Sequence, residues 1–157
     1  MNNTNPASSK INKGARFLEG RNDTVIDTVK RLLWLKKDTW QLTGKWMNWV
    51  QAREFSEEFN KKQYAGFQGW RMPTADEARS LFDKNQENKD HMGQVVRHVS
   101  IFEPGFGFLC WTSTVRNKIQ AIRFGYRKGH QIHDDIYRTS RGSTRLVRDI
   151  EKEDGLI

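Results

Sequence analysis

The sequence predicts an α+β fold in which two helices pack on short antiparallel sheets. Helix-like apolar spacing with capping signals occurs in the first half of the chain, after Asn48 and after Thr74. Short runs rich in β-branched and aromatic residues fill the second half. Helices early and strands late in one chain are typical of the α+β class.

A chain of 157 residues is long enough for one domain with its own core. Residues 1–14 are rich in Asn, Ser and Lys, and we expect a disordered leader there. Residues 15–149 form the expected single domain. Residues 150–157 form a solvated acidic tail.

The first helix is predicted after Asn48, which forms a capping box with Gln51. Apolar side chains then recur at spacings of three and four, at Trp49, Ala52, Phe55 and Phe59.

The second helix is predicted to begin at Thr74, with Glu77 completing a second capping box. Pro73 holds the preceding residue extended. Strand-like pieces are predicted at 15–18, within 24–34, and at 95–101, 108–112, 119–126 and 145–147.

Nothing in the sequence resembles a signal peptide, and the longest apolar run, 32–35, is far shorter than the roughly 20 residues of a membrane span. Cys110 is the single cysteine, so no intramolecular disulfide is possible. We therefore expect a cytoplasmic protein with no membrane partner.

The segment "YAGFQGWRMPTADE", residues 64–77, resembles the "GY-x-DWRLPT-x-x-E" segment of the Lcl C-terminal domain family, which is named for a bacterial collagen-like adhesin. Other blocks follow in the family's order over roughly residues 17 to 148. They are Asp23 to Val25 before Leu33-Trp34, Trp49 with Ala52, Leu81 to Asp83, Trp111 to Thr114, Ala121 to Phe124, Lys128-Gly129 and Arg145 to Arg148.

This resemblance implies a C-type-lectin-like fold related to formylglycine-generating enzymes, and it implies a fold more strongly than an activity. The family's ligand would be an acidic or sulfated polysaccharide. Many members carry a cysteine where this chain has Ser56 and another where it has Leu146. Their joint loss fits a reduced, intracellular setting.

The family-signature residues admit a ligand-binding and a structural interpretation, and we favour the structural one. Trp70 would lie in the core, Arg71 would anchor a loop, and Thr74 would cap a helix. The full set of structural signature residues is Trp34, Trp49, Trp70, Arg71, Pro73, Thr74, Glu77, Trp111 and Ser113.

The function is sought instead in the basic C-terminal segment. Nine basic residues and two acids lie between Val115 and Arg148, so nine less two gives +7 of the chain's net charge of +8. On a strand, Arg123 and Arg127 would share one face and point toward a bidentate anion. The predicted ligand-binding residues are Arg116, Lys118, Arg123, Arg127, Lys128, Arg138 and Arg141. A solvated basic face that only confers solubility is the alternative.

Few residues of the sequence indicate a catalytic, cofactor or metal site. Cys110 lies in an apolar strand, where a thiol is usually inert. His130, His133 and the Asp134-Asp135 pair are too few to predict a metal site. We therefore expect no catalytic residue, no metal and no cofactor.

The sequence thus predicts a non-catalytic recognition module that engages an acidic protein surface or an acidic or sulfated glycan. One alternative is nucleic-acid binding, with Phe106, Tyr126 or Tyr137 as exposed stacking groups. Another is a protein-interaction subunit of a larger intracellular complex.

Overall fold

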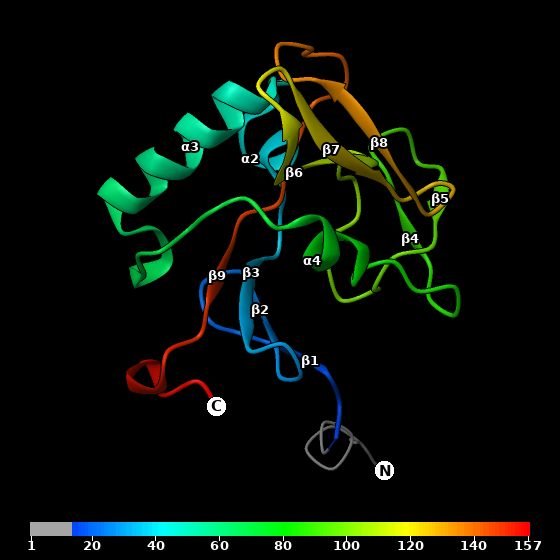
Figure 1. The fold of residues 1–157 in the computed structure, drawn as a ribbon. Helices are drawn as coiled ribbons and strands as arrows, with labels where there is room; N and C mark the ends of the chain where they lie inside the picture. The colour runs from blue at the N-terminus through cyan, green and yellow to red at the C-terminus, as the bar shows by residue number, and fades with distance from the viewer. Residues whose placement is uncertain (1–13) are drawn as a thin grey trace.

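Antiparallel pairing organises the chain into two main sheets in a computed structural model that describes residues 14–157 (Figure 1). The first sheet has the strand order β1-β2-β3-β9, and the second has the order β6-β7-β8. Three α-helices complete the architecture of the described part of the chain, so the α+β prediction is confirmed.

The first sheet joins the two ends of the domain. Its strands are β1 (Phe17–Glu19), β2 (Thr24–Asp27), β3 (Leu32–Leu35) and β9 (Val147–Asp149). The strands β2 and β3 form a hairpin, and all of their strand residues are buried. The C-terminal β9 pairs with β3, which brings residue 149 beside residue 32.

The second sheet is a meander of β6 (Leu109–Asn117), β7 (Gln120–Gly125) and β8 (His130–Asp135). A small ribbon of β4 (Asn88–Lys89) and β5 (Val95–Val96) lies beside it in Figure 1. Because β7 is the central strand, neighbours on both sides occupy its backbone hydrogen bonds.

The helices begin at side-chain caps. Asp38 caps α2 (Thr39–Thr43), Asn48 caps α3 (Trp49–Lys62) and Thr74 caps α4 (Ala75–Arg79), each in a capping box. Single 3₁₀ turns occupy Tyr64–Gly66 and Lys152–Asp154. Figure 1 shows α3 along one side of the molecule and α4 between the two sheets.

Three tryptophans anchor the interior. Trp34 and Trp111 are 0% exposed and Trp70 is 2% exposed, and each belongs to a different apolar cluster. The cluster around Trp34 includes Ala78 of α4 and Phe124 of β7, so it connects the two sheets through α4.

Several sequence predictions need correction. The helix α2 and the strand β8 were not predicted, and the strand expected at 95–101 shrinks to the two residues of β5. The tail is not simply solvated, because Asp154 forms an ion pair of 2.8 Å with Arg148. The expected leader lies outside the described residues except for Gly14.

No helix among residues 14–157 is long and apolar enough to cross a membrane.

Candidate anion-binding site

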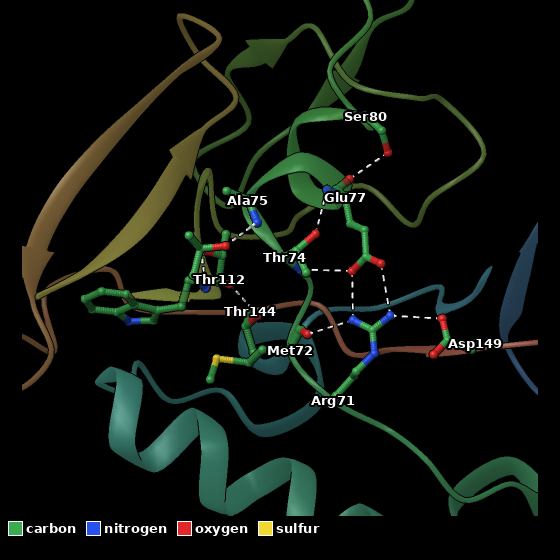
Figure 2. Close-up of polar contacts among 11 residues, drawn as sticks. Arg71, Met72, Thr74, Ala75, Glu77, Ser80, Thr112, Thr144 and Asp149 are labelled. Atoms are coloured by element: carbon green, nitrogen blue, oxygen red, sulfur yellow. Dashed lines mark hydrogen bonds and ion pairs between the residues drawn. The ribbon is translucent and has the colours of Figure 1, made fainter. Parts of the chain in front are cut away.

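The family-signature segment forms a closed polar corner around Arg71 (Figure 2). The guanidinium donates to both carboxylate oxygens of Glu77, at 2.8 and 2.9 Å, and to Asp149 Oδ1 at 3.2 Å. A fourth bond of 3.2 Å goes to the carbonyl of Met72. Arg71 thereby joins the start of α4 to β9, as a structural anchor would.

The same corner caps α4. The backbone N–H of Glu77 donates to Thr74 Oγ1 at 3.2 Å, and the N–H of Thr74 donates to Glu77 Oε1 at 2.9 Å. Burial raises the pKa of the Glu77 carboxyl, but the hydrogen bonds from Arg71 and Thr74 outweigh it and leave the pKa below its ordinary value. The carboxylate is therefore committed to the fold.

The tryptophan before this corner is a core residue. Trp70 donates its indole N–H to the carbonyl of Tyr64 at 3.0 Å, and its backbone N–H and C=O both bond to the side chain of Asn60. The indole N–H of this buried tryptophan therefore has a hydrogen-bond partner.

The second signature block ties β6 to α4. Thr114 Oγ1 accepts the N–H of Ala75 at 3.0 Å, and Ser113 donates its backbone N–H to the carbonyl of Pro73 at 2.8 Å. On the other side, Trp49 of α3 donates its indole N–H to the carbonyl of Thr112 at 2.8 Å. Local hydrogen bonding therefore accounts for this block.

Arg123, which the sequence placed at the centre of the binding face, is 1% exposed. Its guanidinium bonds to Asp134 at 3.0 Å and to the carbonyls of Ser140 and Arg141 at 3.2 and 2.9 Å, and it lies over the ring of Trp111. The prediction of an outward guanidinium is wrong because the segment after β8 covers that face of β7.

Arg127 is also engaged within the chain. It donates to Asp90 at 2.8 Å, and the Asp90 side chain is fully buried. Its guanidinium lies 3.9 Å from the centroid of the Phe108 ring. The two arginines therefore have separate partners and do not form one anion-binding fork.

Beside Arg123 the surface is hollowed, in a space of about 430 Å³ that we call the basic hollow. β8 and the segment that follows it supply most of its walls. The lining residues are Leu109, Arg123, Ile132, His133, Asp134, Arg138, Ser140 and Arg141.

Two arginines at the hollow keep free donors. Arg138 is exposed, and toward the residues that the structure describes it donates only its Nε–H, to Asp134 at 2.7 Å. Arg141 is exposed as well, and within residues 14–157 its side chain donates no hydrogen bond, although it lies 5.6 Å from the Phe108 ring centroid. These guanidiniums can therefore donate to a ligand.

The electrostatics of the hollow favour an anion. Burial raises the pKa of Asp134, but hydrogen bonds from Arg138 and Arg123 bring it below the ordinary value, so this carboxylate stays charged. Three arginines against one carboxylate leave the lining at +2. Arg116 adds to this field because its guanidinium lies 3.2 Å from His133 Nδ1.

The other predicted basic residues do not join the hollow. Lys118 lies in the turn before β7 and Lys128 in the turn after it, so a six-residue strand of about 20 Å separates them. Both are exposed. The seven predicted ligand-binding residues therefore divide between the hollow, the two ends of β7 and internal ion pairs.

His133 and Ser140 are lining residues that the sequence did not nominate for this role. In the sequence His133 draws attention as a metal ligand, and Ser140 carries no signal. Their position depends on the antiparallel pairing of β7 with β8 and on the return of the chain over β7. Such long-range pairing is not visible in local sequence patterns.

The residues weighed for catalysis and stacking lie mostly inside. Cys110 is buried, and burial raises the pKa of its thiol. Phe106 and Tyr126 are 1% and 3% exposed, so the expectation that they stack on bases at the surface is wrong. Among residues 14–157 no three His, Cys, Asp or Glu side chains come together as a metal site.

Comparison with protein families identifies residues 23–148 as an Lcl C-terminal domain. The chain belongs to the Lcl C-terminal domain family. No curated protein and no solved structure matches the chain. The C-type-lectin-like relationship of this Lcl domain therefore stays a prediction.

Proposed function

We propose that this Lcl domain is a non-catalytic recognition module that binds an anionic group of its partner in the basic hollow. One observation carries the proposal, namely that Arg138 and Arg141 present free donors beside a concave space of about 430 Å³. Arg donors of this kind match the geometry of carboxylate, sulfate and phosphate oxygens.

The hollow supports a recognition role in two further ways. Arg123 and Asp134 hold each other at its floor, so the site is preorganised before any ligand arrives. Ile132 and Leu109 add apolar surface next to the cations, which suits a ring-bearing or aliphatic carrier of the anionic group.

Two partners carry the required chemistry, an acidic or sulfated glycan and an acidic protein surface. The family resemblance favours the glycan, and the Ser56 and Leu146 replacements at the family's cysteine positions favour the protein. Nucleic acid is a weaker candidate because only Tyr137 of the three proposed stacking residues is exposed, at 66%.

Binding should be measured with heparin, polyglutamate and a mixed-sequence single-stranded RNA, each titrated at low and at high salt. The test variant is Arg138→Ser with Arg141→Ser. The matched control is Lys61→Ser with Lys62→Ser, which removes the same charge from the exposed C-terminal turn of α3.

We expect the hollow variant to weaken binding of one of the first two probes by roughly tenfold or more, because each charge-assisted hydrogen bond contributes on the order of 1.5 to 3 kcal/mol. The control should bind like the wild type. Equal losses of affinity in both variants would mean that binding depends on net charge alone and not on the hollow. A preference for RNA over both other probes would overturn the proposal.

A further inference from the structure

Exposed apolar side chains gather at the end of the second sheet where β6 turns into β7. Val115 is 52% exposed, Ile119 is 59% exposed, and Tyr137 is 66% exposed. All residues from 115 to 119 are exposed, so this hairpin end projects from the body of the domain. Leaving these apolar side chains in contact with water is unfavourable, and a partner that covers them would remove that cost.

The two segments that carry these residues are tied to each other and to the start of α3. The backbone N–H of Ile136 donates to the carbonyl of Ile119 at 3.0 Å, and the N–H of Trp49 donates to the carbonyl of Ile136 at 3.0 Å. Figure 1 accordingly shows the β6–β7 turn, the loop after β8 and the start of α3 at the same end of the molecule. We call Val115, Ile119 and Tyr137 the apolar tip.

Basic side chains surround the apolar tip. Arg116 and Lys118 alternate with its residues along the hairpin, and Arg138 follows Tyr137. All three are exposed, and Asp135 is the one acidic residue in the segments 115–119 and 135–138. Three bases less one acid leave this end at +2.

The hairpin geometry helps to aim these side chains outward. The pairing of β6 with β7 shifts register on both sides of Val115. Such bulges bend a strand and redirect its side chains. Apolar and basic residues that would alternate between two faces of a flat strand are therefore both exposed at its end.

We propose that the apolar tip docks on the surface of a bilayer that contains anionic lipids. Val115 and Ile119 would enter the boundary between headgroups and acyl chains, where Tyr137 is also favoured, while Arg116 and Lys118 contact lipid phosphates. A lipid surface fits this arrangement because the charge of its headgroups is spread over the surface. Scattered basic side chains can bind it without a bidentate contact to one anionic group.

Charge argues against the simplest alternative, a second copy of the chain, because two surfaces of +2 would repel each other. The proposal also revises the expectation of no membrane partner, which depended on the absence of a spanning segment. Peripheral docking needs no such segment. Arg138 borders both sites, but Val115, Arg116, Lys118 and Ile119 lie outside the lining of the hollow, so variants at these positions test the tip separately.

The test is flotation of the full chain with vesicles of phosphatidylcholine alone and of phosphatidylcholine mixed with phosphatidylglycerol. Two double variants separate the apolar from the electrostatic contribution to binding. The first is Val115→Ser with Ile119→Ser, and the second is Arg116→Gln with Lys118→Gln. Their controls are Val29→Ser with Val95→Ser, which are 70% and 51% exposed elsewhere, and Lys61→Gln with Lys62→Gln, at the far end of α3 about 20 Å away.

We expect binding to the anionic vesicles only, with a loss of roughly tenfold or more in each tip variant and none in the controls. An environment-sensitive dye on Ile119→Cys should shift to the blue on binding; Cys110 is buried and should stay unlabelled.

Three results would overturn the proposal. The first is a wild type that does not float with anionic vesicles. The second is a serine variant that floats like the wild type, which would leave adsorption by charge alone. Dimerisation that the serine variant abolishes, measured by light scattering, would assign the tip to a second copy. The Arg138→Ser, Arg141→Ser variant should still float, which separates this outcome from failure of the hollow.

Discussion

The corner around Arg71 and the basic hollow are both built from arginine and carboxylate, yet one is closed and the other open. Arg71 makes four hydrogen bonds, to Glu77, Asp149 and the carbonyl of Met72. Within residues 14–157, Arg138 makes one bond, to Asp134. An arginine with four of its five donors occupied within the chain holds the fold, whereas one with most of its donors free is available to a ligand.

The hollow contains both kinds within a few residues. Arg123 at its floor is buried and, as Arg71 does, bonds to carboxylate and to backbone carbonyl oxygens, whereas Arg141 at its edge is exposed. Burial lowers the pKa of Arg123, but the hydrogen bond and the charge of Asp134 oppose that effect. Net charge along a segment therefore says little about which of its cations can bind a partner.

The largest expected effect is on the core that supports the closed corner. Trp70→Ala should destabilise the domain by about 3 to 5 kcal/mol, because it removes a buried indole and leaves a cavity. Chemical denaturation measures the change, with Gln68→Ala as the exposed neighbouring control. A Trp70→Ala protein that unfolds like the wild type would remove Trp70 from the core.

The next effect distinguishes the floor of the hollow from its edge. Arg123→Ser should destabilise the domain by about 3 kcal/mol, because Asp134 and two backbone carbonyls lose a buried partner. Arg116→Ser, on the same sheet but exposed, should change stability by less than about 0.5 kcal/mol. Equal denaturation midpoints for the two variants would contradict the closed role of Arg123.

A smaller effect depends on pH. The pKa of Glu77 is lowered in the folded state, so its ionised form contributes stability above the ordinary value of 4.5, and that contribution is lost as the pH falls through the folded value. Glu77→Gln should cost about 1.5 kcal/mol at neutral pH. The difference from the wild type should shrink in acid, as thermal unfolding at several pH values would show.

The control for that series is Asp76→Asn. The Asp76 side chain is 83% exposed, and its ion pair with Arg79 lies at the surface. Such pairs contribute little to stability. A difference for Glu77→Gln that stays constant from neutral to acidic pH would mean that the carboxylate charge does not stabilise the corner.

The closed corner was predictable from sequence because its chemistry is local. The capping boxes of Asn48 with Gln51 and of Thr74 with Glu77 each join residues three positions apart, and both form as predicted. The short helix α2 has the same kind of box, between Asp38 and Gln41, but its five residues offer no apolar periodicity to indicate a helix.

The hollow was only partly predictable because distant segments build it. The alternation of side chains along a strand correctly places Arg123 and Phe124 on opposite faces of β7. It does not reveal that residues 140 and 141 return over Arg123. The polar strand β8, His130–Asp135, has no buried residue to indicate a strand. Arg138 and Arg141 were nominated by charge, and only the fold shows that they share a concave surface.

The smallest expected effect on stability is that of the open arginines. Arg138→Ser with Arg141→Ser should change the free energy of unfolding by less than about 0.5 kcal/mol, since both side chains are exposed and Asp134 keeps its bond to Arg123. The same variant is expected to lose anion binding. A loss of stability close to that of Arg123→Ser would show that the donors of Arg138 and Arg141 are also engaged within the chain. The basic hollow would then be part of the fold and not a binding site.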